Sequence, residues 1–265
     1  MKKLIVKIVF MSFVALIIFA MSNELYALEI DMVEIPGKNY SVMKTEVTQK
    51  LYETIMGENP SSFSWGNKYL SKDELRELNA STSDYPVDNV SWYDAIYFCN
   101  TLSERLGYTP VYSLNGETDI TKWNYEPHKD KEVNGYIKQN LSANGFRLPT
   151  LREWQYAARG GENYIYSGSN ELDKVAWCYG NSNGVSHPVA QKKPNGYGLY
   201  DMNGNVYEWC WNVYGCYYNY RYACGGSWCD NDNRCKVDSR NYYYAYARNP
   251  WFSNMGFRIV RSTGK

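Results

Sequence analysis

Cysteines are the residues of this sequence best suited to chemistry, and most of them lie near the C-terminus. The seven thiols belong to Cys99, Cys178, Cys210, Cys216, Cys224, Cys229 and Cys235. A catalytic thiol needs a base beside it, but His128 and His187 are each isolated in a loop-like segment. The sequence has no His-x-x-x-His pair, serine elbow or glycine-rich phosphate loop. These residue types therefore indicate neither thiol-base nor phosphate-transfer chemistry, and the odd number leaves at least one thiol without an intramolecular partner.

Composition sets further limits on the function. Lysines plus arginines and aspartates plus glutamates number 28 each, so the formal charge is zero. A neutral chain without a run of basic residues gives no support for a nucleic acid or an anionic membrane as partner. The 27 tyrosines instead suit half-exposed surfaces, because each has an apolar ring and a polar hydroxyl. The length of 265 residues is enough for one substantial core.

The first 27 residues have the features of an export signal. Three lysines precede the apolar run from Ile8 to Ala20, which is shorter than the roughly 20 apolar residues that span a bilayer. Ala27 offers a small residue for cleavage, and residues 20–22 offer a second zone. We therefore expect an exported chain that begins at residue 28, at the cell envelope surface or secreted, where cysteines can pair. An uncleaved membrane anchor is the alternative.

Periodicity and capping residues predict the helices and strands that position the cysteines and histidines. Two short strands are expected within residues 30–48, joined by a turn at Pro36–Gly37, and then a short helix over 48–56. Ser91 begins a helix that runs to about residue 106, and Thr150 begins another that Gly160 ends. In the helix that begins at Ser91, the side facing the core is expected to hold Ala95, Cys99, Leu102 and Leu106.

Other segments are predicted from their lack of long periodicity. Residues 57–85 are loop-like, with one helical turn expected at 72–78. Residues 108–145 are expected to be an ordered insertion with short strands. Beyond residue 161 few periodic segments exceed six residues, which predicts mostly ordered loop.

Four long phrases, followed by GGSW and GFRIVRS, carry a family resemblance. The phrases are TEVTQKLYETIMGENPSSF, YPVDNVSWYDAIYFCNTLSERLG, FRLPTLREWQYAARGG and PNGYGLYDMNGNVYEW. In this order they resemble the formylglycine-generating-enzyme, or sulfatase-modifying-factor, family, and the resemblance covers most of residues 28–265. It implies one α+β domain with a C-type-lectin fold, two main helices, short antiparallel strands and long ordered loops.

The same resemblance bears on the family's oxidase activity. The family's enzymes oxidise a cysteine of a client sulfatase and, as the resemblance implies, use two copper-binding thiols after the GGS phrase. Here Cys235 stands at the second thiol position, but Asp230 stands at the first, and Cys229 is one residue too early. A carboxylate does not replace a thiolate as a ligand for Cu(I). We therefore expect no enzymatic activity and no catalytic cofactor, with an active oxidase that uses Cys229 and Cys235 as the alternative.

The phrase NGNVYEW raises the question of a structural metal. The resemblance implies that such a loop can hold calcium through Asn205, Glu208 and backbone carbonyls, which are the oxygen ligands that hard cations prefer. The alternative is that Glu208 is a buried, hydrogen-bonded brace for the loop. The segment before it, AWCYGNSNGVSHP, lacks aspartate, so a second calcium site of the family type is not expected.

An unusual set of amino acids fills the stretch between GGSW and GFRIVRS. Asn, Asp, Tyr, Ser, Cys and Ala dominate it, and residues 207–246 contain ten tyrosines. Each of these amino acids has a codon that arises from AAC or AAT when only the adenines change. Lys, Glu, Gln, Met and Trp cannot arise in this way and are almost absent from the filling, Lys236 and Trp251 being the exceptions.

Composition, position and fold together make residues 210–254 resemble the variable region of a target protein of a diversity-generating retroelement. In such systems error-prone copying of template adenines rewrites one gene segment, and several targets use the C-type-lectin fold. The resemblance implies a ligand-binding protein whose loops carry interchangeable side chains on a fixed frame. Its partner is expected to be a protein or another surface ligand, and not a nucleic acid. An accessory envelope protein with a fixed partner, from an AT-rich genome, is the alternative.

Two sets of residues follow from this hypothesis. The expected frame consists of Gly225, Gly226, Ser227, Trp228, Val237, Arg240, Gly256, Phe257 and Arg258. The expected ligand contacts are Tyr217, Tyr218, Tyr220, Tyr222, Cys229, Asp230, Asp232, Tyr242, Tyr243, Tyr244, Tyr246 and Trp251, with Asp238 as a weaker member. Tyr, Ser, Asn and Asp combine rigid aromatic area with adaptable hydrogen bonding, as they do in antibody loops.

Overall fold

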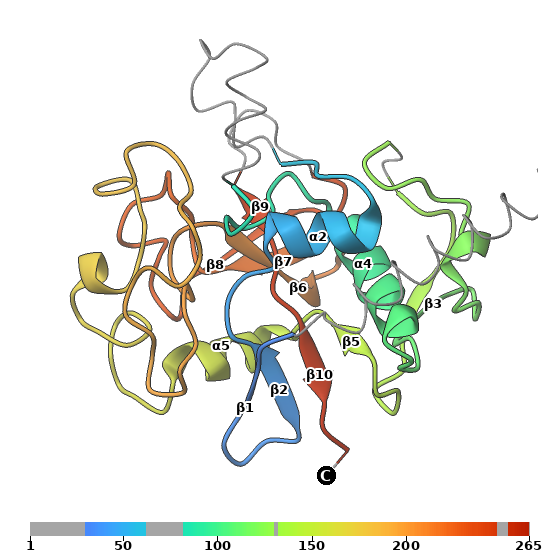
Figure 1. Cartoon of the computed structure of the whole chain (residues 1–265), viewed down its shortest axis with the longest axis horizontal. Coiled ribbons are helices and arrows are strands. Elements are labelled where there is room, and N and C mark those ends of the chain that lie inside the picture. Colours follow the sequence, from blue (N-terminus) through green and yellow to red (C-terminus); the bar gives the residue numbers. More distant parts are fainter. Residues whose placement is uncertain (1–29, 62–81, 130–131, 248–253, 265) are drawn as a thin grey trace, which may run out of the picture. The chain divides into compact units, whose positions relative to one another are not determined.

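The computed structural model describes residues 30–61, 82–129, 132–247 and 254–264. The chain divides into two units, Met1–Asp31 and Met32–Lys265, and the second contains all the elements described below (Figure 1). The predicted export signal, the predicted helical turn at 72–78 and Trp251 lie outside the described residues. In the part that is described, no helix has both the length and the apolar character needed to cross a membrane.

Three α-helices form among the described residues, each close to its predicted range. They are α2 (Gln49–Met56), α4 (Trp92–Arg105) and α5 (Leu151–Arg159), with two short 3-10 helices, η2 (Ile120–Lys122) and η3 (Leu172–Lys174). Ser91 and Thr150 each complete a capping box with the acidic residue three positions later. Gly160 ends α5 in the left-handed conformation that favours glycine. The local capping signals therefore predicted these helices correctly.

The predicted core stripe of α4 is confirmed except at its end. Ala95, Cys99 and Leu102 are fully buried, whereas Leu106 lies at the helix C-terminus and is half-buried. Leu106 is the residue that caps the helix, so it lies outside the last helical turn.

The strands form three sheets within the described residues. The first has the order β1-β2-β10-β5 and is antiparallel throughout: β1 (Met32–Glu34), β2 (Tyr40–Met43), β10 (Val260–Ser262) and β5 (Phe146–Arg147). The predicted insertion supplies a separate antiparallel pair, β3 (Tyr112–Leu114) and β4 (Ile137–Gln139). The third has the order β8-β7-β6-β9: β8 (Arg240–Tyr244), β7 (Tyr217–Cys224), β6 (Tyr207–Tyr214) and β9 (Met255–Gly256). In this sheet β9 pairs with β6 in parallel, unlike the other pairs.

Beyond residue 161 the chain is mostly ordered loop, as predicted, but the tyrosine-rich stretch forms longer strands than its lack of periodicity indicated. β6 and β7 are each eight residues long and form a hairpin with a turn at Gly215 and Cys216, and β8 pairs along the outer side of β7. Tyrosine favours strands because its ring packs well on a pleated surface. Since tyrosines occur on both sides of these strands, the usual alternation of apolar and polar residues is hidden in the sequence.

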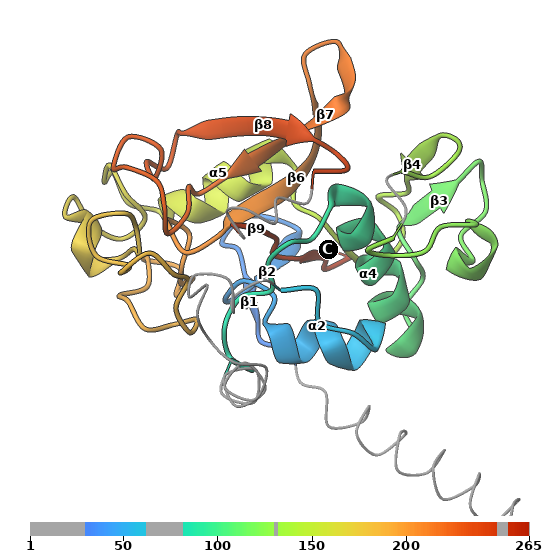
Figure 2. The same cartoon turned by 90° about the horizontal axis from the view of Figure 1, so that it is seen from above.

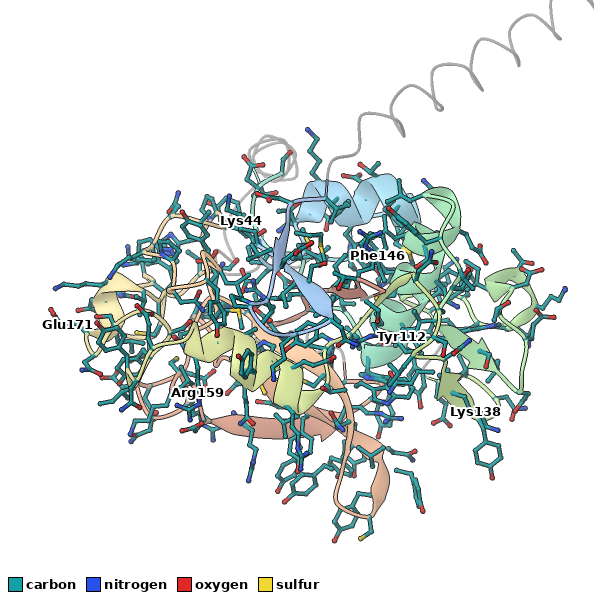
Figure 3. All side chains as sticks on the ribbon, turned by 90° about the horizontal axis from the view of Figure 1, so that it is seen from below. Lys44, Tyr112, Lys138, Phe146, Arg159 and Glu171 are labelled. Carbon is teal, nitrogen blue, oxygen red and sulfur yellow. The ribbon has the colours of Figure 1, made fainter. Side chains whose placement is uncertain are left out.

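Helices pack against both faces of this third sheet. α5 packs on the face that carries Cys210 and Cys224, where Trp154 joins them in one buried cluster. Figures 2 and 3 show α5 alongside this sheet. On the opposite face, at the start of α4, the Trp92 ring Nε1 donates to the Cys210 carbonyl at 3.1 Å, and Trp209 donates to the Val90 carbonyl at 2.8 Å. The base of the hairpin is therefore held on both sides, and its outer half extends beyond the core.

Candidate functional site

The tyrosines of β7 and β8 separate into two sets because side chains alternate along a strand. Tyr220 lies opposite Tyr244, and Tyr222 lies opposite Tyr242 in the antiparallel register. These four rings therefore share one face of the sheet. The intervening pair, Arg221 opposite Tyr243, points to the other face.

The first set is part of a continuous group of rings, which we call the tyrosine face. Its members are Tyr214, Tyr217, Tyr220, Tyr222, Tyr242, Tyr244 and Tyr246. Ring centroids are 3.6 Å apart for Tyr214 and Tyr242 and 4.0 Å apart for Tyr220 and Tyr244. Exposure ranges from 36% for Tyr246 to 59% for Tyr217 among the four most exposed members. The face is thus a solvent-accessible aromatic surface built from three strands and one turn.

Hydroxyl contacts add order to the tyrosine face. A side-chain hydrogen bond with Tyr244 raises the pKa of Tyr220 to about 12. A similar hydrogen bond with Tyr242 raises the pKa of Tyr214. In these pairs the Tyr214 and Tyr242 rings are also stacked, and the Tyr220 and Tyr244 rings are tilted by 36°. The result is a neutral surface whose rings are held by their neighbours.

The second set points into the domain. The Arg221 guanidinium lies 3.9 Å from the Trp92 ring centroid, and its Nη1 donates to the Trp211 carbonyl at 3.1 Å. Tyr243 packs on Tyr207, with ring centroids 5.5 Å apart, and burial raises its pKa. Tyr243 was predicted as a ligand contact, but it lies on the face opposite Tyr242 and Tyr244.

The loop between β7 and β8 holds the predicted acidic and thiol contacts. Asp230 accepts a short hydrogen bond from the Ser227 hydroxyl. The Cys229 thiol lies 3.3 Å from the same hydroxyl and 3.4 Å from Asn254 Nδ2. Both residues are half-buried, and after burial the Asp230 carboxylate is among the causes that raise the pKa of Tyr243. They therefore lie near the inward-facing set rather than on the tyrosine face.

The remaining predicted contacts are exposed. Tyr218 lies near the tip of the hairpin and is 81% exposed, and Asp232 is exposed in the loop. Asp238 is exposed and forms an ion pair with Arg159 of α5, which Figure 3 labels beside the sheet. The thirteen predicted contacts thus occupy the tyrosine face, the hairpin tip and the loop, with Tyr243 facing inward and Trp251 outside the described residues.

The predicted frame is buried except for Trp228, which is half-buried, and Arg240. Gly226 has a φ of +76°, and a Cβ there would lie 2.7 Å from the Cys235 sulfur, so the position requires glycine. Ser227, Phe257 and Arg258 are fully buried. Arg240 differs because it is exposed at the start of β8.

The side chains of the predicted calcium loop do not fit a calcium ion as they are placed. Arg258 donates to both carboxylate oxygens of Glu208 at 2.7–3.0 Å, and Trp154 Nε1 donates to the same carboxylate at 2.6 Å. The Asn205 side-chain oxygen accepts from the His187 backbone N–H at 2.9 Å. A cation would have to displace the guanidinium from this buried carboxylate. The arrangement is that of the alternative, a bonded brace, and in the described ranges no group of three or more His, Cys, Asp or Glu is placed to hold a metal.

The two thiols of the oxidase alternative lie in different surroundings. Cys229 contacts polar groups of the loop, whereas Cys235 is buried in an apolar cluster with Cys178 and Tyr166. Burial raises the pKa of both Cys229 and Cys235, which lowers the fraction of thiolate. This arrangement does not favour a pair of copper-binding thiolates.

Sequence reasoning missed two features of the site. Tyr214 was not among the predicted contacts, although it stacks on Tyr242. Because side chains alternate along a strand, Tyr214 points to the same side of YEWCWNVY as Cys210 and Asn212, and this alternation is the signal that places it on the tyrosine face. His187 was interpreted as an isolated surface residue. Its ring instead stacks on Trp177, with centroids 3.8 Å apart, a contact that no local pattern could show.

Comparisons with known proteins identify the family. The Sulfatase-modifying factor enzyme 1-like domain matches residues 19–263. The chain is 34% identical to a protein of Paenibacillus barcinonensis named "Chaperone protein LppX", over 84% of this chain and 80% of that protein. It is 26% identical to "Inactive C-alpha-formylglycine-generating enzyme 2" of Bos taurus, over 89% of this chain and 77% of the relative.

A solved structure gives the same assignment. The fold matches "Treponema denticola variable protein 1" with a TM-score of 0.70 and 31% sequence identity, covering 88% of this chain and 92% of that one. Three capped helices, short strands and long ordered loops agree with the C-type-lectin architecture that the sequence predicted. The chain therefore belongs to the family of sulfatase-modifying factor enzyme 1-like domains, and within it the chain resembles a variable protein with the C-type-lectin fold.

Proposed function

We propose that this chain is an exported, non-enzymatic binding protein that holds its ligand on the tyrosine face. The observation that carries the proposal is a group of seven tyrosine rings in mutual contact on a solvent-accessible sheet surface whose other side is anchored to the core. Tyrosine is enriched at the centres of protein interfaces, because its ring contributes large area with little loss of side-chain freedom. The ligand is a protein or another surface ligand, since the chain is neutral and its sequence has no run of basic residues for a nucleic acid.

We also propose that this surface is diversified. Substitution of an exposed side chain usually changes stability by less than about 0.5 kcal/mol. Four rings of the tyrosine face are exposed and three are half-buried, whereas most of the frame residues are buried. The exposed tyrosines of β7 and β8 are thus separated from the buried residues of the frame. The similarity to a protein named a variable protein supports this reading.

The first experiment is to sequence the gene and its surroundings. We expect codons derived from AAC or AAT at Tyr217, Tyr218, Tyr220, Tyr242 and Tyr244, and a nearby near-copy of the segment with AAC or AAT at those positions, beside a reverse transcriptase. A segment without such a copy contradicts the diversification and favours an accessory protein with a fixed partner.

The second experiment tests binding with a display library. One library varies five positions of the tyrosine face, and a control library varies five exposed apolar residues elsewhere, namely Tyr136, Leu141, Tyr164, Ile165 and Tyr179. Both are selected against lysozyme as the probe. We expect folded binders from the first library only. Equal yields from both libraries, or none from either, would argue against a dedicated binding face.

The oxidase alternative has its own test. The chain is incubated aerobically with Cu(I) and a sulfatase-type cysteine peptide, and formylglycine is measured by mass spectrometry. We expect no conversion, because Cys229 and Cys235 lie in different surroundings. Conversion that is lost in Cys235→Ser would overturn the non-enzymatic assignment.

A further inference from the structure

Two buried thiols lie next to one another at the base of the β6–β7 hairpin. The Cys210 and Cys224 sulfurs are 3.9 Å apart, and the residues are 14 positions apart in the chain. Both side chains are fully buried in the cluster that includes Trp154 of α5. They lie directly below the outer half of the same hairpin, which carries the tyrosine face.

The strand register explains why the two sulfurs meet. Glu208 pairs with Cys224 and Trp209 pairs with Ala223, so Cys210 is the diagonal neighbour of Cys224 on the same face. The register becomes irregular immediately afterwards, between Trp209 and Val213. A disulfide requires sulfurs about 2.05 Å apart. Closing the pair therefore needs an approach of about 2 Å, by a shift of the backbone as well as rotation of the side chains, and the irregular part of the ladder is where such a shift can occur.

The other thiols are placed differently. Cys99 is buried on α4, Cys216 is exposed in the hairpin turn, and Cys178 and Cys235 belong to a separate apolar cluster. Cys229 contacts Ser227 and Asn254. Among the described residues, the Cys210 and Cys224 sulfurs are thus placed in direct contact with each other.

We propose that Cys210 and Cys224 form an intramolecular disulfide that closes the base of the hairpin. The oxidant is a disulfide, either small, such as oxidised glutathione, or the active-site disulfide of a thiol–disulfide oxidoreductase. One thiolate attacks the oxidant disulfide and releases its first thiol, and the second thiolate attacks the mixed disulfide and releases the other. Two protein thiols are oxidised and one oxidant disulfide is reduced to two thiols. This inference does not depend on the binding proposal.

The bond forms while the hairpin is still open. Both thiols are inaccessible in the folded domain, and burial raises the pKa of Cys210 well above its ordinary value, which slows attack by that thiol. Oxidation during folding then fixes β6 to β7 whichever side chains occupy the outer half. The bond restricts the unfolded chain, so it stabilises the domain without touching the exposed rings.

The experiment maps the bond in the full chain. Cys216→Ser, in which the exposed thiol is removed, is refolded with oxidised and reduced glutathione, free thiols are alkylated, and the protein is digested with chymotrypsin and trypsin. Cleavage leaves Cys210 in the peptide 210–211 and Cys224 in the peptide 223–228, and neither peptide contains Cys229 or Cys235. We expect a fragment that joins these two peptides and disappears on reduction. Alkylation of both residues, or linkage of either to another cysteine, would overturn the proposal.

Thermal unfolding measures what the bond does. We expect the oxidised protein to unfold about 5–10 °C above the same protein in reductant, and Cys224→Ala to show no such difference. Refolding should form the bond much faster than treatment of the folded, reduced protein. An equal midpoint with and without reductant would contradict a stabilising role, even if the linked fragment were found.

Discussion

At the scale of single residues, the most informative group is the buried carboxyl of Asp201, which is not among the predicted ligand contacts. One carboxylate oxygen of Asp201 accepts from the Ala190 backbone N–H at 2.7 Å. Its other oxygen is buried without a hydrogen-bond partner within the described part of the chain. Burial is the main cause that raises the pKa of Asp201 to about 6 from its ordinary 3.8. The folded protein therefore holds a proton that the unfolded chain has already released in this range of pH.

This difference predicts a stability that falls with pH. Below pH 3.8 both states are protonated and the stabilising contribution is complete; it is lost as pH rises towards 6. We expect the free energy of unfolding to decrease by on the order of 2–3 kcal/mol across this window. Asp201→Asn should remove this part of the slope, as measured by urea denaturation at several pH values. Glu46, whose pKa burial also raises, contributes in the same direction and remains in the variant.

The matched control is Asp238→Asn, which changes an exposed carboxylate. It should retain the pH dependence of the wild type. If Asp201→Asn also retains it, the proton is held elsewhere. The sequence LYDMNGN gave no sign of this role, because burial of Asp201 depends on segments far away in the chain.

At the scale of elements, the alternation along β7 separates a structural side from an exposed side. Arg221→Ala removes the contact with the Trp92 ring and the hydrogen bond to the Trp211 carbonyl. We expect it to lower the free energy of unfolding by about 2–4 kcal/mol, because a buried backbone acceptor and aromatic surface lose their partner. Tyr220→Ala, the adjacent substitution on the tyrosine face, should cost less than about 1 kcal/mol. Chemical denaturation of both variants measures the difference, and equal losses would mean that the two faces are not distinct.

Prediction from sequence succeeds for the helices and fails for the strands of the third sheet. The helices were predicted because Ser91, Thr150 and Gly160 carry their signals within one turn. The β6–β8 strands were not, because tyrosines on both faces hide the alternation. The two-residue β9 depends on a parallel pairing with β6 across nearly 50 residues, which no local pattern encodes. The sequence therefore predicted which stretch carries the candidate site, but the division of its residues between two faces follows only from the strand register.

At the scale of the whole domain, the frame residue Arg258 and the rings of the tyrosine face differ in how many segments they connect. The buried Arg258 guanidinium donates to the Met43 and Tyr200 carbonyls at 2.9 and 2.8 Å and pairs with Glu208. It thus joins segments separated by up to 215 residues. The rings of the tyrosine face contact mainly one another, at the edge of a single sheet. The domain therefore depends on the frame and not on the surface.

This contrast predicts that many surface changes together cost less than one change in the frame. A variant with Tyr217, Tyr218, Tyr220, Tyr242 and Tyr244 all changed to Ser should lose about 1–3 kcal/mol in total, since exposed cross-strand pairs contribute a few tenths to 1 kcal/mol each. Arg258→Ala should lose about 3–5 kcal/mol, because it leaves the buried Glu208 carboxylate without its partner. Denaturant titrations of the two variants, followed by tryptophan fluorescence, measure both losses. If the variant with five tyrosines changed unfolds more easily than Arg258→Ala, these tyrosines stabilise the fold. Their side chains could then not be replaced freely, which contradicts the proposed diversification.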